Sequence, residues 1–73
     1  MEQIKVLAKF NLDKIEIAAF SRAGRSYKIT RQNFVHHFRE GDRTIFIFHV
    51  SDEANTYQLR FEPETLKWFL VED

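Results

Sequence analysis

The sequence contains no cysteine, and this absence removes two common ways of stabilising a small domain. Neither a disulfide framework nor a thiolate metal site can form in this chain of 73 residues. A chain of this length also buries only roughly 60% of the surface that its unfolded form exposes. We therefore expect its stability to depend on dense packing or on self-association.

Glycine, proline and long apolar runs are scarce as well. The chain has two glycines and one proline, without an internal repeat or a low-complexity tract, so extensive disorder is not expected. No stretch approaches the roughly 18 apolar residues of a membrane span, and no basic segment followed by an apolar run opens the chain. We expect a soluble, cytoplasmic protein with one small β domain over residues 1–73 and no membrane contact.

Aromatic residues are abundant by contrast. Eight phenylalanines, two tyrosines and one tryptophan occur among the 73 residues. Each large ring removes on the order of 150–250 Å² from water when it is buried, so a few rings can build much of a small core. The aromatic content offsets the missing disulfides.

Alternation of apolar and polar residues is the dominant pattern, and turn residues separate the alternating runs at short intervals. The first run, Gln3 to Phe10, is typical. The pattern predicts an all-β fold, a small antiparallel meander of about six strands that forms a strongly curved sheet or a partly closed barrel. The second-ranked alternative places one or two helical turns within Thr30 to Arg39.

Turn residues also set a strand register. Two-residue loops at Ala23-Gly24 and Gly41-Asp42 place Phe20 opposite Tyr27, Phe38 opposite Ile45 and Phe34 opposite His49. Later turns extend the pairing: the loop Ser51 to Asn55 places Ile45 opposite Phe61 and Ile47 opposite Leu59, and the Pro63-Glu64 turn places Phe61 opposite Leu66. This register predicts one apolar wall, made of Phe34, His36, Phe38, Ile45, Ile47, His49, Tyr57, Leu59, Phe61, Leu66, Trp68 and Leu70. A slip of one residue would move a strand's side chains to the other face.

A second apolar group falls on the opposite face in this register. Small antiparallel sheets usually bury one face only, so the second group needs a cover. Either the first two strands fold over it, or another protein does, including a second copy that would make a homodimer. The candidate interface residues are Val35, Phe46, Phe48, Phe69 and Val71.

Charge is balanced overall but unevenly distributed. Eleven acidic residues offset eleven lysines and arginines, which argues against general affinity for nucleic acid. The segment from Ser21 to Arg39 nevertheless holds five basic residues and no acidic one. Arg22 and Arg25 should face each other at a hairpin tip, where an anion would relieve their repulsion. The alternative is that these side chains extend into water or contact the acidic C-terminal half.

The basic hairpin is the candidate site for an anion or for single-stranded nucleic acid. Its arginines suit phosphate groups, and its tyrosine offers a ring on which a base can stack. The residues are Arg22, Arg25, Tyr27, Lys28 and Arg31.

Catalytic and metal-binding patterns are weak. His36 and His49 should lie diagonally on one face, within reach of one metal ion, but two histidines without a third ligand make a weak metal site. The alternative places both as hydrogen-bonded histidines at the edge of the core. No serine lies near a histidine and an acid in a recognisable spacing, and glycine-rich phosphate loops are absent. We expect no enzyme and no cofactor.

One segment resembles a known family. The residues Phe20, Gly24-Arg25, Tyr27 and Ile29, with the later Tyr57-Gln58-Leu59 and Trp68-Phe69-Leu70, are similar to the core of a family of short bacterial proteins of unknown function. The family usually has an aromatic residue at the Ser21 position, which this chain lacks. The resemblance implies a small β fold in the bacterial cytoplasm and carries no activity.

The sequence as a whole favours a non-enzymatic β module that acts through protein contact, self-association included. Weak binding of single-stranded nucleic acid or another anion by the basic hairpin is the alternative.

Overall fold

The computed structural model describes residues 1–71, which form a single antiparallel sheet. The predicted all-β fold is confirmed, with seven strands rather than about six. Residues 1–71 contain no helix, so the helical alternative for Thr30 to Arg39 is wrong. The strands are β1 (Glu2–Asn11), β2 (Lys14–Arg22), β3 (Arg25–Lys28), β4 (Arg31–Glu40), β5 (Arg43–Ser51), β6 (Thr56–Glu62) and β7 (Lys67–Val71).

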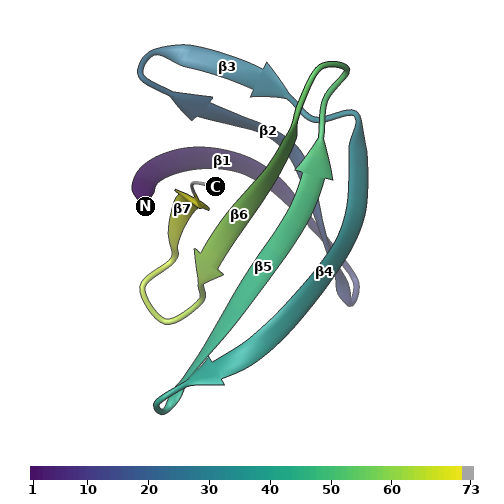
Figure 1. Cartoon of the computed structure of the whole chain (residues 1–73). Helices are drawn as coiled ribbons and strands as arrows, with labels where there is room; N and C mark the ends of the chain where they lie inside the picture. Colours follow the sequence, from purple (N-terminus) through teal and green to yellow (C-terminus); the bar gives the residue numbers. More distant parts are fainter. Residues whose placement is uncertain (72–73) are drawn as a thin grey trace.

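Two meanders make up the sheet, and they meet where the first and last strands pair. The order across the sheet is β3-β2-β1-β7-β6-β5-β4, so β3 and β4 are its two edges. Figure 1 shows the sheet curling into an open half-barrel, with the start of β1 next to β7. The backbone between the edge strands bonds to both sides, Ile29 N–H to the Ala18 carbonyl and Thr30 N–H to the Ser51 carbonyl.

The core fills the inner, concave face of the curled sheet. Phe48 is 1% exposed, and Val50 and Leu59 are fully buried beside it. Phe20 stacks on Tyr27 with 4.9 Å between ring centroids, which gives the β2–β3 hairpin its contact with this core. Among residues 1–71, three of the eleven buried core residues are aromatic, namely Phe20, Phe48 and Phe61, and the other eight are aliphatic.

The two hairpins with tight turns have the predicted register. Phe20 lies opposite Tyr27, and Phe38 lies opposite Ile45. Gly24 and Gly41 both adopt positive φ, +78° and +66°, as two-residue hairpin turns require. At these turns the sequence alone sets which residues face each other.

The predicted β5–β6 register is wrong by one residue. Phe46 and Phe48 lie opposite Phe61 and Leu59, positions where Ile45 and Ile47 were expected. The loop has four residues rather than five, because Ser51 pairs with Thr56. A slip of one residue reverses the faces, so the predicted wall of twelve is divided between both sides of the sheet.

The β6–β7 register is wrong by two residues, which preserves the faces. Phe61 lies opposite Trp68 rather than Leu66. Leu66 belongs to a four-residue turn, where it is 74% exposed and adopts a φ of 59°. Its amide donates to the Glu62 carbonyl at 2.8 Å, which closes the turn.

Candidate functional site

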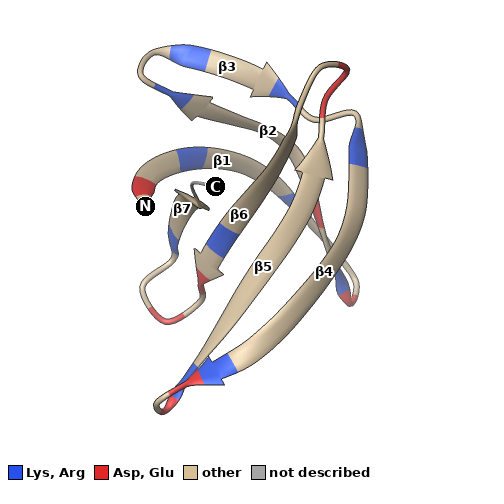
Figure 2. Ribbon diagram, in the orientation of Figure 1, with Lys and Arg blue, Asp and Glu red and all other residues tan. Residues whose placement is uncertain are grey.

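Strand β4 is the long free edge of the sheet. It has ten residues, pairs with no strand other than β5 within residues 1–71, and exposes every residue except Gln32. Between Arg31 and Arg39 it carries no lysine, arginine, aspartate or glutamate, which Figure 2 shows as an uninterrupted uncharged stretch. Free N–H and C=O groups on such an edge are a template for pairing with another strand.

The outer face of β4 carries a row of rings. The β4–β5 register correctly predicted that they share a face, but the prediction that this face is the core wall is wrong. Phe34 stacks on His49 of β5 with 4.0 Å between ring centroids, and His36 lies 5.1 Å from His49. Phe38 continues the row at 6.4 Å from His36. Phe34 is 55% exposed and Phe38 is 39% exposed. We call Phe34, His36, Phe38 and His49 the aromatic row.

His49 is the partly enclosed member of the aromatic row. Its Nε2 atom is buried and has no hydrogen-bond partner among the described residues. Burial, and to a smaller extent the neighbouring His36, hold the pKa of His49 below its ordinary value. A neutral ring suits the face-to-face contact with Phe34.

The predicted proximity of His36 and His49 is confirmed, but they gain no third ligand. Among residues 1–71, no group of three or more histidines, cysteines, aspartates or glutamates lies close enough to hold a metal ion. Aromatic stacking occupies the space around His49 instead. The two rings thus form part of an aromatic surface.

A small second core supports the outer face beneath this row. Ile45 is fully buried and Ile47 is 7% exposed, although both point away from the main core. Arg60 of β6 closes over them and donates to Glu40 at 2.9 Å and to Glu62 at 3.1 Å. The Arg60 guanidinium lowers the pKa of Glu40, chiefly through its hydrogen bond. The end of β4 is thereby tied to β6 across β5.

The five predicted interface residues do not share a surface. Val35, Phe46 and Phe48 lie on the inner face, and Phe48 is buried by the chain's own strands. Phe69 lies on the outer face, opposite Arg60, and Val71 lies on the same face, opposite Gln58. The division follows from the β5–β6 register. Of the five, Val35 alone lies on the free edge, where it is 39% exposed.

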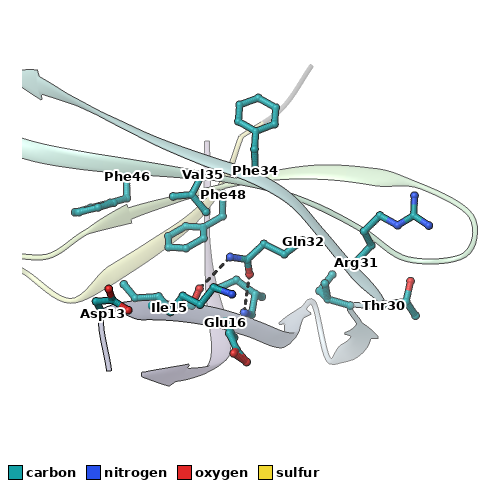
Figure 3. Close-up of a pocket in the computed structure, with 13 residues that line it drawn as sticks. Asp13, Ile15, Glu16, Thr30, Arg31, Gln32, Phe34, Val35, Phe46 and Phe48 are labelled. Atoms are coloured by element: carbon teal, nitrogen blue, oxygen red, sulfur yellow. Dashed lines mark hydrogen bonds between the residues drawn. The ribbon is translucent and has the colours of Figure 1, made fainter. Parts of the chain in front are cut away.

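An open groove of about 620 Å³ lies on the inner side, between β2 and the β4–β5 pair. Figure 3 shows Val35, Phe46 and Phe48 on one of its walls, with Phe34 pointing to the other side of the sheet. Gln32 crosses the groove, where its amide accepts from Ile17 N–H at 3.0 Å and donates to the Ile15 carbonyl at 2.9 Å.

The Gln32 side chain thereby makes the hydrogen bonds to β2 that the backbone of a neighbouring strand would make. An amide side chain carries one donor group and one acceptor, like a peptide group, so it satisfies a stretch of free strand edge. The sequence analysis missed this role, because a single glutamine within a strand has no distinguishing pattern.

The basic hairpin has the predicted geometry, but two of its five candidate residues contact other parts of the chain. Arg22 does lie opposite Arg25. Arg22 Nε, however, donates to Glu2 at 2.8 Å, and Tyr27 packs between Phe20 and Tyr57. A carboxylate of the chain therefore pairs with Arg22, and the ring expected to stack on a base packs against the core.

Comparisons with other proteins give no further guide. The chain matches no protein-family model, no curated protein and no solved structure at a significant level. The resemblance to short bacterial proteins stays a prediction. Residues 1–71 contain no helix with the length and apolar character needed to cross a membrane.

Proposed function

We propose that this chain is a protein-contact module that self-associates through strand β4. The observation that carries the proposal is the free backbone edge of β4, with exposed Phe34, Val35 and Phe38 along an uncharged stretch. Natural sheets usually protect such an edge with charges, proline, short length or a covering segment. In the part of the chain that the structure describes, residues 34–38 of β4 have none of these protections.

The other edge of the sheet supports the same reasoning by contrast. Strand β3 has four residues, Arg25 and Lys28 stand at its two ends, and all but Tyr27 are exposed. Short length and positive charge are the protections expected of an edge that stays unpaired. The two edges therefore differ in the way expected if one stays solvated and the other takes a partner.

A second exposed apolar group lies on the β1–β2 hairpin, but its first strand also carries charges. Leu7, Phe10 and Leu12 are 66%, 67% and 100% exposed. Leu7 and Phe10 lie opposite residues of β2, whereas among the described residues β1 pairs with β7 only through residues 2–4. Lys5 and Lys9 place charges on the part of β1 that has one neighbour, and charge is one of the protections of an open edge. The hairpin therefore makes a good control surface.

A second copy suits the β4 edge because no net charge opposes association. The chain has equal numbers of acidic and basic residues, and the contact stretch is uncharged. One pair of strands with a few rings makes a small interface, so we expect a dissociation constant on the order of 1–100 µM.

Light scattering after size exclusion tests the proposal over a range of concentrations. The wild-type mass should rise from 8.8 kDa toward twice that value as concentration increases. Phe38→Lys places a charge on the edge of each copy and should raise the dissociation constant above about 1 mM. Leu7→Lys makes a similar change on β1, where Lys5 and Lys9 already place charges, and should leave dimerisation unchanged. A wild-type monomer at millimolar concentration, or dissociation by Leu7→Lys alone, contradicts the proposal.

A further inference from the structure

We infer that two copies pair their β4 strands antiparallel about a two-fold axis through His36, so that residues 34–38 of each copy align. This inference rests on the proposed self-association and adds its register. In this arrangement β5-β4 of one copy continues into β4-β5 of the other. The resulting contact places Phe34 opposite the partner's Phe38 twice, and His36 opposite its own copy.

Symmetry limits the registers that need comparison. A two-fold axis normal to the sheet relates each residue to the same residue on the same face of the sheet. Residues directly opposite each other in an antiparallel pair also share a face, and faces alternate along a strand. The two numbers in each opposed pair must therefore be both odd or both even, which places the axis on a residue rather than between two residues.

A β-bulge excludes the register centred one residue earlier. The β4–β5 pairing shifts between Gln32 and Phe34, so Asn33 is an extra residue in β4. Bulges interrupt regular pairing and bend the strand. A register centred on Val35 would leave regular pairing only over residues 34–36, whereas the His36 register aligns the five residues 34–38 symmetrically.

Side-chain chemistry disfavours the register centred one residue later. With the axis on His37, Phe34 would face the partner's Glu40 and Val35 would face the partner's Arg39. With the axis on His36, an exposed phenylalanine faces an exposed phenylalanine, and cross-strand aromatic pairs stabilise a sheet. Glu40 is moreover held by Arg60, so its carboxylate is not free to turn away from an approaching apolar ring.

The aromatic row is already ordered for this contact. Phe34 is fixed by its stack on His49 at 4.0 Å, and His36 lies within 6 Å of both rings, at 5.9 Å from Phe34 and 5.1 Å from His49. Side chains held by packing lose little conformational entropy on association. The two rows would join into one continuous aromatic strip across the axis.

Cysteine cross-linking tests this register directly, since the chain has no cysteine of its own. In the His36 register the two copies of residue 36 lie roughly 5 Å apart between Cα atoms, within disulfide range. The two copies of residue 35, and those of residue 37, lie about 8 Å apart, beyond that range. Residue 35 of one copy lies directly opposite residue 37 of the other.

Three variants are oxidised with diamide and separated on a non-reducing gel: Val35→Cys, His36→Cys and His37→Cys. We expect His36→Cys to form covalent dimers at least about tenfold faster than Val35→Cys or His37→Cys alone. An equimolar mixture of Val35→Cys and His37→Cys should cross-link about half as fast as His36→Cys, because random association makes half of its dimers heterodimers. This mixture retains His36, so it tests the register even if the His36 variant does not fold.

The outcomes separate the register from the self-association on which it rests. Fast cross-linking of Val35→Cys alone or His37→Cys alone, with dimers present by light scattering, overturns the register and leaves self-association standing. Equal rates for all three single variants overturn the antiparallel arrangement. Absence of both dimers and cross-links overturns the inference together with the proposed function.

Discussion

At the scale of single residues, Gln32 has the role that sequence patterns hide most completely. It lies opposite Val50 on the inner face and bonds to the backbone of β2 on the other side of the groove. These two hydrogen bonds hold the start of β4 against β2. They also leave residues 34–40 as the free part of the edge.

Replacing Gln32 with glutamate tests this role with almost no change in shape. A carboxylate still accepts from Ile17 N–H, but it cannot donate to the Ile15 carbonyl, which is left facing a second acceptor. We expect Gln32→Glu to lower the free energy of unfolding by about 1–3 kcal/mol, measured by urea denaturation at neutral pH. Gln3→Glu, the same change at an exposed position of β1, should cost less than about 0.5 kcal/mol. Equal effects of the two variants would refute the assignment.

Individual residue positions of the candidate site could be predicted from the sequence, but the surface that these residues form could not. The proximity of His36 and His49 followed from the Gly41-Asp42 turn alone, because a two-residue loop fixes which residues face each other. The stacking of the Phe34 ring on His49 was not predicted, although Phe34 was correctly predicted to lie opposite His49. Stacking depends on side-chain rotamers, which strand alternation does not specify.

At the scale of strands and turns, glycine-containing loops gave correct registers and the other loops did not. The β5–β6 loop is shorter than predicted because Asp52 organises it, accepting from Ala54 N–H and Asn55 N–H at 2.8 and 2.7 Å. Aspartate side chains commonly form such turns. The sequence Ser51 to Asn55 fits both a four-residue and a five-residue loop, and the choice reversed the faces of β5 relative to β6.

The β1–β2 turn carries a leucine in a conformation that glycine or asparagine adopts more easily. Leu12 has a φ of 58° and is 100% exposed, so it gains no burial to offset the left-handed backbone. We expect Leu12→Asn to raise the free energy of unfolding by about 1 kcal/mol, measured by urea denaturation. Leu7→Asn also removes an exposed leucine but relieves no left-handed backbone. A gain of equal size at Leu7 would show that loss of exposed apolar surface, rather than turn strain, is responsible.

At the scale of the whole molecule, the curled sheet has two edges with opposite properties. The fold nearly closes on itself, since Gln32 connects β4 to β2 and the Ile29–Thr30 link connects the edges along the chain. The rest of β4 has no such connection within residues 1–71, and the apolar residues of this edge are exposed. Strand alternation predicted the curved, partly closed sheet. It did not predict which strand would remain open, because strand order depends on the pairing of β1 with β7, whose residues lie far apart in the sequence.

Self-association through β4 makes thermal stability depend on concentration. Because only the folded monomer dimerises, dimerisation stabilises the folded state by mass action. This stabilisation decreases as the protein is diluted. For a domain of this size, where 1 kcal/mol corresponds to about 4–8 °C, a tenfold dilution within the dimeric range should lower the melting temperature by roughly 3–5 °C. Calorimetry of wild type at concentrations between about 0.1 and 1 mM measures this slope. Phe38→Lys should melt at a temperature independent of concentration, and Leu7→Lys should retain the wild-type slope. If Phe38→Lys also kept the slope, association would have to use a surface other than the edge of β4.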